Sequence, residues 1–440
     1  MNIFFVSLGC DKNLVDSEVM LGLIREKNYK ITNNEEEADI IIVNTCCFIN
    51  DAKEESINTI LEMADYKKNG HCKALIATGC MAQRYSKEIE EEIPEVDGIV
   101  GTSSYESIVN VIETALEGQH CVALENIDYL PEKESNRVLT TGGYFSYLKI
   151  AEGCDKRCTY CIIPSLRGKY RSRPIEQLVA EATQLALNGV KELMLVAQET
   201  TLYGVDLYGA KSLPRLLKEL CKIDGLEWIR ILYCYPEEIT DELIQTMKDE
   251  EKVCHYLDIP IQHASDNILK RMARRTSKQE LVDMIGKLRK EIPDIALRTT
   301  LITGFPGETE EDHQELMEFV DQMNFDRLGV FTYSPEDGTP AAKMENQVEE
   351  EIKERRKDEI MSLQQEVSID NGEAMIGKAL KVMIEGKLPE DNVYIGRTYK
   401  DAPNIDGYIF VSCDYELMSG DFVQAKVTEA KEYDLIGEVI

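Results

Sequence analysis

The chain has 440 residues, of which 43% are hydrophobic and 30% are charged. At about 150 residues per domain this length suits roughly three domains, and the composition is that of a globular protein rather than a disordered or membrane protein. The formal net charge of −32 indicates a surface that repels phosphate backbones, which argues against a general nucleic-acid binder and favours a basic protein or a small molecule as substrate.

The N-terminal segment is predicted to be a first strand rather than a targeting signal. Residues Met1–Leu8 lack the basic region of a signal peptide and run directly into a motif. The expected compartment is therefore the cytoplasm. In that reducing compartment the 13 cysteines should be mostly thiols or metal ligands, because disulfides are disfavoured there.

Residues 1–125 alternate short apolar runs with segments of helical periodicity. The runs Asn2–Leu8, Asp39–Val43 and Lys73–Thr78 are rich in strand-forming residues, and Leu14–Arg25 and Ala52–Tyr66 have helical spacing. This alternation is typical of βαβ units. It predicts an N-terminal domain built on an open parallel sheet.

Three cysteines of this domain follow predicted strands. Cys10, Cys46 and Cys80 each lie two or three residues beyond a strand end. The carboxyl ends of parallel strands lie along one edge of an open sheet, where such folds bind their ligands. These cysteines, far apart in sequence, are therefore predicted to meet in space, although buried core thiols are an alternative.

A polar stretch over residues 126–143, with Pro131–Asn136 and Thr140–Gly143, predicts an interdomain linker. A second α/β region follows over residues 144–345. Its first strand is expected at Tyr144–Ala151, and a helix at Ile175–Asn188. Further strands are predicted at Glu192–Ala197, Trp228–Leu232, Tyr256–Ile259, Ala296–Ile302 and Arg327–Thr332. About six strand-helix repeats favour a partial β/α barrel with its site at the carboxyl ends of the strands.

The loop after the first barrel strand carries Cys154, Cys158 and Cys161 in the spacing C-x3-C-x2-C, with no fourth Cys or His close by. A structural zinc site normally has four protein ligands. A 4Fe-4S cubane held by three thiolates instead keeps one iron free for a ligand that is not protein. The loop therefore predicts an iron-sulfur cluster, with a zinc site or buried thiols as the alternative.

The last third of the chain contains a charged segment and a strand-rich segment. Residues 346–374 predict a charged helical linker with a solvated face. Residues 375–440 predict a small antiparallel β-barrel. Its five short strands are expected at Leu380–Glu385, Val393–Arg397, Tyr408–Val411, Phe422–Glu429 and Leu435–Ile440.

The loop Cys154, Cys158 and Cys161 resembles the signature of the radical S-adenosylmethionine enzymes. The resemblance implies that the three thiolates hold a 4Fe-4S cluster. Its open iron would bind S-adenosylmethionine, and an electron from the cluster would cleave the sulfonium to give a 5′-deoxyadenosyl radical.

The sequences around Cys10, Cys46 and Cys80 point to one family within this superfamily. The stretches Ser7–Glu18, Asn44–Cys47 and Thr78–Ala82 are similar to the N-terminal domain of the methylthiotransferases, and the final segment resembles the TRAM domain of that family. The resemblance covers essentially the whole chain. It implies that Cys10, Cys46 and Cys80 bind an auxiliary 4Fe-4S cluster that carries or supplies sulfur.

One branch of this family modifies transfer RNA, and another modifies an aspartate of ribosomal protein uS12. The opening Ser7–Asn13, with Leu8 and Lys12, resembles the ribosomal-protein branch. The C-terminal segment from Met375 has seven Lys or Arg against twelve Asp or Glu, which suits a basic protein better than RNA. A transfer-RNA methylthiotransferase and a non-enzymatic iron-sulfur or zinc scaffold that binds the ribosome are the alternatives.

The resemblance also implies a mechanism and partners. One S-adenosylmethionine would donate a methyl group to sulfur near the auxiliary cluster, and a second would give the radical that abstracts hydrogen from the aspartate β-carbon, in a dry site. The expected partners are uS12 or the small ribosomal subunit and an electron donor such as a flavodoxin-like protein. No membrane is expected, and direct RNA binding is not expected to dominate.

Further candidate residues lie at other barrel strand ends. Gln198 and Glu199 end the second barrel strand and are expected to contact the amino group of S-adenosylmethionine. The turn containing Gly304, Pro306 and Gly307 could approach a ligand closely, or it could simply be a tight turn before a helix. The basic run Arg167, Arg171 and Arg173 could bind a carboxylate or be a solvated surface run.

Overall fold

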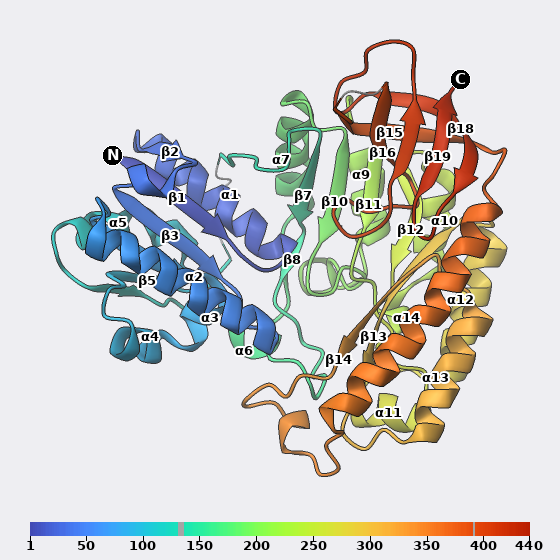
Figure 1. The fold of residues 1–440 in the computed structure, drawn as a ribbon, viewed down its shortest axis with the longest axis horizontal. Coiled ribbons are helices and arrows are strands. Elements are labelled where there is room, and N and C mark those ends of the chain that lie inside the picture. Colours follow the sequence, from blue (N-terminus) through green and yellow to red (C-terminus); the bar gives the residue numbers. More distant parts are fainter. Residues whose placement is uncertain (131–135, 390–391) are drawn as a thin grey trace.

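The computed structural model describes residues 1–130, 136–389 and 392–440. Figure 1 shows an N-terminal α/β unit, a central α/β unit and a C-terminal β-barrel. Residues 131–135 of the predicted linker lie outside the described residues. Within the described ranges, no helix combines the length and the apolar character needed to cross a bilayer.

The N-terminal unit is a parallel sheet in the order β2-β1-β3-β4-β5-β6. Its strands are β1 (Asn2–Ser7), β2 (Lys30–Thr32), β3 (Ile40–Thr45), β4 (Ala74–Thr78), β5 (Gly98–Val100) and β6 (Cys121–Ala123). The helices between them are α1 (Asp11–Glu26), α2 (Asn50–Asn69), α3 (Gly79–Arg84), α4 (Ser86–Glu92) and α5 (Ile108–Leu116). Strands β3 and β4 are buried along their whole length, because helices cover both faces of the sheet.

The chain order of this sheet creates a switch point. After β1 the chain adds β2 on one side and β3 on the other. Ligands of open parallel sheets bind outside the carboxyl ends of the strands at such a point. Cys10 follows β1 and Cys46 follows β3, so both lie at the switch point.

The central unit is an open parallel sheet in which each strand pairs with the next along the chain, in the order β14-β13-β12-β11-β10-β7. The predicted partial β/α barrel is confirmed. Its strands are β7 (Phe145–Lys149), β10 (Glu192–Val196), β11 (Trp228–Ile231), β12 (Val253–Asp258), β13 (Ala296–Thr303) and β14 (Arg327–Thr332), and the short β8 (Ala151–Glu152) and β9 (Arg171–Ser172) pair separately. The helices are α6 (Ile163–Arg167), α7 (Ile175–Leu187), α8 (Val205–Tyr208), α9 (Leu213–Cys221), α10 (Asp241–Asp249), α11 (Asp266–Arg271), α12 (Lys278–Glu291) and α13 (Glu310–Met323).

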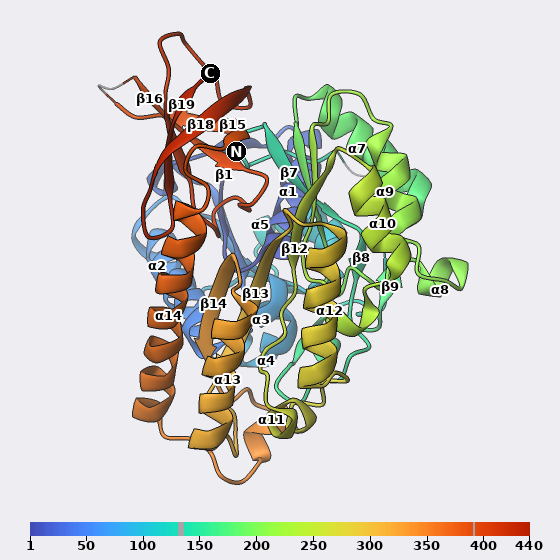
Figure 2. The same cartoon turned by 90° about the vertical axis from the view of Figure 1, so that its right-hand side faces the viewer.

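Helix α14 (Glu350–Glu373) lies against the central unit, as Figure 2 shows. The prediction of a solvated face is wrong for one side of this helix. Lys353, Arg356 and Ile360 are buried there, because α14 packs on β14 and α13 and the charged heads have buried partners. Arg356, for example, pairs with Glu308 at 2.9 Å.

The C-terminal barrel is closed in the order β15-β16-β17-β19-β18. Its strands are β15 (Ala379–Lys387), β16 (Val393–Thr398), β17 (Ile409–Ser412), β18 (Phe422–Ala430) and β19 (Leu435–Val439). The predicted barrel is confirmed, with one departure from antiparallel pairing. A closed ring of five strands cannot alternate direction throughout, and β17 and β19 accordingly pair in parallel.

The barrel packs at the amino ends of the central strands. Arg397 of β16 pairs with Glu192, the first residue of β10, at 2.6 Å, and Lys381 of β15 pairs with Glu227, just before β11, at 2.7 Å. The carboxyl ends, where the cysteine loop follows β7 and β8, are at the opposite edge of the sheet, away from the barrel (Figure 1).

Candidate functional site

The cysteines of the N-terminal unit lie at the start of helices and at a strand end. Cys10 is the residue before α1, Cys46 follows β3 directly and Cys80 is in the first turn of α3. Gly9 has a φ of +89°, and a Cβ there would lie 2.8 Å from Cβ of Cys46. Only glycine therefore lets the chain before Cys10 pass this close to Cys46.

Two of these three thiols are buried. Cys46 and Cys80 are 8% and 7% exposed, whereas Cys10 is exposed. Burial raises the pKa of the Cys80 thiol to about 12, against an opposing effect of Arg167 and with added effects of Cys10 and Cys46. Such a thiol is protonated at neutral pH, and a metal cluster would be the partner that stabilises its thiolate.

The loop cysteines are also grouped. Burial raises the pKa of Cys154 and of Cys161 to about 12, and the charge of Cys158 acts on both. The Cys158 sulfur lies 3.6 Å from the hydroxyl of Tyr235, with which it forms a hydrogen bond. Each triad consists of three cysteines, so the only metal-binding atoms that it offers are sulfurs, which fits an iron-sulfur cluster.

Neither triad is a compact site for one ion. Among the described residues, no group of three or more Cys, His, Asp or Glu side chains is arranged to hold a single metal ion. Thiolates that bind different irons of one cubane do not need to converge on one point.

Gln198 and Glu199 follow β10 and have unused hydrogen-bond acceptors. Glu199 Oε1 accepts from the Thr201 backbone N–H at 2.8 Å. Gln198 Oε1 and Glu199 Oε2 are buried without a partner in the described part of the chain. Burial raises the pKa of Glu199 to about 7, so its charge changes near neutral pH.

Arg274 is a candidate that the sequence did not reveal. Its guanidinium lies 4.2 Å from the ring centroid of Tyr235, the residue bonded to Cys158. Its Nε and Nη1 are buried with no partner among the residues described. Unused acceptors after β10 and unused donors on Arg274 near the loop cysteines match the ammonium and carboxylate groups of S-adenosylmethionine. Nothing in the basic run 270–275 distinguishes Arg274 in the sequence.

The turn containing Gly304, Pro306 and Gly307 is held by protein contacts. The two glycines have φ values of +69° and +84°, and a Cβ at Gly304 would lie 2.2 Å from Lys353 Cγ. Arg271 Nε donates to the Pro306 carbonyl oxygen at 2.7 Å. These protein contacts account for the conformation of the turn. Its contact with S-adenosylmethionine stays a prediction.

Helix α6 connects the two cysteine groups. It begins two residues after Cys161, and Ile162 and Leu166 belong to the same hydrophobic cluster as Cys80. The hydroxyl of Thr102, in the N-terminal unit, donates to the Leu166 carbonyl oxygen at 2.7 Å. The loop that carries one triad is thus anchored in the core of the unit that carries the other, and Figure 1 shows α6 next to α3.

A second contact joins the N-terminal unit to the central unit, at the edges where the strands of the two sheets end. The ammonium group of Lys12 lies 3.2 Å from the ring centroid of Tyr233, and the Tyr233 hydroxyl donates to Asp11 at 3.3 Å. Tyr233 follows β11, and Asp11 and Lys12 follow Cys10. The strand ends of the two sheets therefore face one another.

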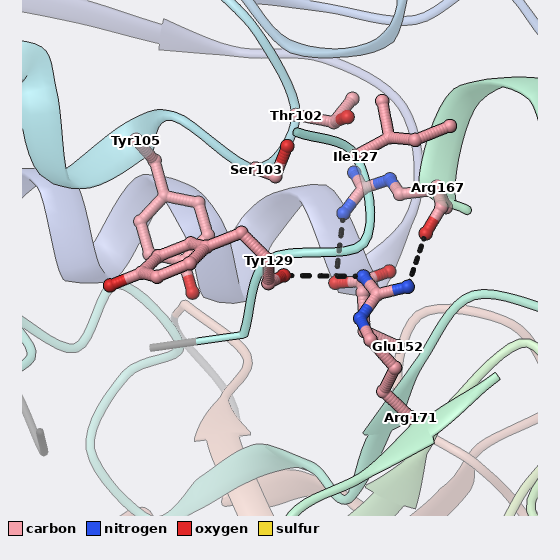
Figure 3. A pocket seen from close by; sticks show the side chains of 8 residues that line it. All are labelled: Thr102, Ser103, Tyr105, Ile127, Tyr129, Glu152, Arg167 and Arg171. Atoms are coloured by element: carbon pink, nitrogen blue, oxygen red, sulfur yellow. Dashed lines mark hydrogen bonds and ion pairs between the residues drawn. The ribbon is translucent and has the colours of Figure 1, made fainter. Parts of the chain in front are cut away.

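A buried ionic network lies between the units. Lys149 and Glu152 pair at 2.7 Å, and Arg167 pairs with Asp16 at 2.7 Å and with Glu152 at 3.2 Å. Figure 3 shows Arg167 and Glu152 on the wall of a small pocket. Its lining residues are Thr102, Ser103, Tyr105, Ile127, Tyr129, Glu152, Arg167 and Arg171.

The structure corrects the view of the basic run as a solvated surface. Arg167 is only 3% exposed and has protein partners. Arg173 pairs with Glu181 at 2.7 Å, and Arg171 donates to the Arg167 carbonyl oxygen at 3.1 Å. A solvated run is wrong for these residues because each is at least partly buried and bonded to other protein groups.

Three families match successive parts of the chain. Residues 2–101 match the family described as "Uncharacterized protein family UPF0004", residues 148–320 match the radical SAM superfamily, and residues 376–440 match the TRAM domain. A solved radical S-adenosylmethionine methyltransferase, TsrM from Kitasatospora setae, is 12% identical with a TM-score of 0.54, over 90% of this chain and 77% of that one. At this identity the likeness concerns the fold alone.

Relatives of high identity extend over the full length. A protein of Lachnoclostridium phytofermentans named ribosomal protein uS12 methylthiotransferase RimO is 68% identical over 99% of both chains. A protein of the same name from Clostridioides difficile is 51% identical over 100% of this chain and 99% of the relative. Together with the geometry of the two cysteine groups, these matches show that the chain belongs to the RimO family of radical S-adenosylmethionine methylthiotransferases.

Proposed function

We propose that this protein methylthiolates the β-carbon of an aspartate of ribosomal protein uS12, using two 4Fe-4S clusters and two molecules of S-adenosylmethionine. The observation that carries the proposal is the link through α6, which ties the loop of Cys154, Cys158 and Cys161 to the core beside Cys80. Two sulfur donor sets at facing strand ends can serve one substrate. The names of the full-length relatives support the choice of uS12.

The chain's own residues would bind and shield the cofactors. The loop triad would hold one cluster and Cys10, Cys46 and Cys80 the other. When bound, the clusters and S-adenosylmethionine supply a carbon radical and a methylated sulfur. Gln198 and Glu199 would accept from the ammonium group of S-adenosylmethionine and Arg274 would donate to its carboxylate, since these atoms have no partner in the described chain.

The charge of the chain supports a basic substrate. The net charge is −32, and an acidic surface attracts a basic ribosomal protein and repels transfer RNA. All thirteen cysteines lie within the described residues and none of them forms a disulfide, which is consistent with the proposed cytoplasmic setting. A flavodoxin-like electron donor is the proposed reductant.

The substrate is tested by incubating the reconstituted full-length protein with uS12, with small ribosomal subunits and with transfer RNA. Mass spectrometry should find the methylthio group on an aspartate of uS12, free or within the subunit. Modification of transfer RNA alone would instead support the transfer-RNA methylthiotransferase.

The cofactors are tested separately by anaerobic reconstitution. Iron and sulfide should approach two cubanes per chain, and dithionite should release 5′-deoxyadenosine from S-adenosylmethionine. The Cys46→Ala variant should lose the auxiliary cluster, whereas Cys47→Ala, at the adjacent buried cysteine, should keep both. Zinc without iron, or no cleavage, would favour the non-enzymatic scaffold.

A further inference from the structure

The guanidinium group of Arg167 makes four hydrogen bonds, three of them across the interface between the units. Nη2 donates to Cys80 Sγ at 3.6 Å and to Asn13 Oδ1. Nη1 donates to Asp16 Oδ2 at 2.7 Å and to Glu152 Oε2 at 3.2 Å. All four hydrogens on the two terminal nitrogens therefore have acceptors, and the orientation of the group toward Cys80 is fixed.

The side chains around this contact are buried and electrically balanced. The side chains of Arg167, Asp16 and Glu152 are 2%, 7% and 9% exposed. Lys149 adds a second positive charge to the two carboxylates. Because these side chains are buried, a hydrogen bond from the guanidinium to a sulfur is stronger here than it would be at the surface.

The network continues to the other site. Glu152 Oε1 accepts from Gln198 Nε2 at 2.8 Å, and Gln198 lies at the carboxyl end of β10 next to Glu199. Glu152 thus accepts a hydrogen bond from Arg167 at Oε2 and one from Gln198 at Oε1. Arg167 and Glu152 join a cysteine of one triad to a residue proposed for S-adenosylmethionine binding.

We propose that Arg167 is a positioning residue of the auxiliary site, which holds Cys80 in place and raises the reduction potential of the cluster bound there. This inference rests on the proposed function, because it requires a cluster on Cys10, Cys46 and Cys80. Hydrogen bonds to the sulfurs and burial are among the factors that set cluster potentials. A fixed cation bonded to a ligand sulfur stabilises the reduced cluster, which carries one more negative charge.

The inference is tested by redox titration of the reconstituted full-length protein, followed by electron paramagnetic resonance. The signal of the auxiliary cluster is assigned from the Cys154→Ala/Cys158→Ala/Cys161→Ala variant. Arg167→Gln should lower the ratio of reduced to oxidised auxiliary cluster at a fixed potential by about tenfold, which is about 59 mV for a one-electron couple. The potential of the cluster on the loop triad should stay unchanged.

Lys149→Gln is the matched control, because it removes one positive charge from the same network without a sulfur contact by Lys149. Its effect on the auxiliary ratio should be less than about threefold, or about 28 mV. Arg167→Lys keeps the charge and guards against a failure of Arg167→Gln to fold. It should lower the ratio by about threefold, because a single ammonium group cannot replace the guanidinium fork.

The outcomes separate this inference from the proposed function. No shift in either Arg167 variant, or equal shifts in Arg167→Gln and Lys149→Gln, would overturn the role of Arg167 and leave the two-cluster enzyme intact. Absence of any auxiliary signal in the unchanged protein would overturn both.

Discussion

Glu199 is a buried carboxyl group whose charge changes near neutral pH. Burial raises its pKa to about 7, and its Oε2 has no partner in the described chain. If the ionised form binds the ammonium group of S-adenosylmethionine, affinity should rise with pH. The ionised fraction grows from roughly one tenth at pH 6 to roughly nine tenths at pH 8, so the dissociation constant should fall about tenfold.

Calorimetric titration of the reconstituted protein with S-adenosylmethionine checks this expectation. Glu199→Gln should bind more weakly and with no pH dependence from this group. Glu242→Gln, at an exposed side chain of the same unit, should behave like the unchanged protein. A pH dependence that persists in Glu199→Gln would assign it to another group.

His263 is a fully buried histidine whose ring stays neutral. Its Nδ1 accepts from the Ser265 backbone N–H at 2.9 Å, so the ring proton is on Nε2, which lies 3.7 Å from Glu308. Burial lowers the pKa of His263 from 6.5 to about 3. The 3.7 Å approach is therefore a contact of a neutral ring rather than an ion pair.

The lowered pKa of His263 predicts acid sensitivity. Between pH 6.5 and about 3 the unfolded chain binds a proton that the folded chain does not, so stability falls as pH falls, by about 2 kcal/mol at pH 5. Urea unfolding of the metal-free protein at pH 7 and pH 5 should show this loss.

His263→Asn isolates the effect, since its side-chain oxygen can still accept from Ser265 and cannot be protonated. The neighbouring Glu308, whose pKa burial raises to about 7, contributes in the opposite direction in both proteins. Burial lowers the pKa of His313, and, against the effect of burial, the hydrogen bond from Ser265 lowers that of Asp312, so these two groups contribute in the same direction as His263 in both proteins. An equal loss of stability in both proteins would exclude His263 as the source.

At the scale of elements, α6 is the short helix on which the interface depends. Leu166 is 2% exposed and packs in the core of the N-terminal unit. Leu166→Ala should lower the free energy of unfolding by about 2–5 kcal/mol, because it leaves a cavity there. Leu187→Ala, at a side chain 76% exposed, should cost less than about 0.5 kcal/mol. Urea unfolding measures both, and similar values for the two would mean that α6 does not anchor the interface.

The longer elements were predictable from the sequence and the shortest ones were not. Periodicity predicted strands such as β1 and β14. The predicted strand ends in turn showed that the two cysteine groups follow strands. Strands β2, β5 and β6 have three residues each, too few for a pattern of period two. Helix α6 has only five residues. Its role depends on packing against the N-terminal unit, which is distant from it in the sequence.

The partners of charged residues were also beyond the sequence. Arg167 could be noted as part of a basic run, but its bonds to Cys80 and Asp16 join residues 87 and 151 positions apart. The contacts of Arg274 and the burial of one face of α14 likewise depend on residues that are distant in the sequence. Charge patterns alone cannot distinguish a solvated side chain from one that folding pairs with a distant, oppositely charged group.

At the scale of the whole molecule, a buried ionic group holds the C-terminal barrel to the central unit. Glu192, Arg230 and Arg397 are all 0% exposed. Glu192 pairs with Arg230 at 2.8 Å and with Arg397 at 2.6 Å. Arg397 also pairs with Glu385, on its own barrel. Glu192 is therefore the anion that two buried guanidinium groups share.

Glu192→Gln should lower the free energy of unfolding by about 3–5 kcal/mol, because removing one partner leaves uncompensated buried charge. Arg397→Met should cost less, since Glu192 keeps Arg230 as a partner. Lys381→Met breaks the exposed pair with Glu227 between the same two units and should cost less than about 1 kcal/mol. Thermal and urea unfolding rank the three, and a Lys381 effect as large as that of Glu192 would mean that general surface attraction, rather than the buried group, fixes the barrel in place.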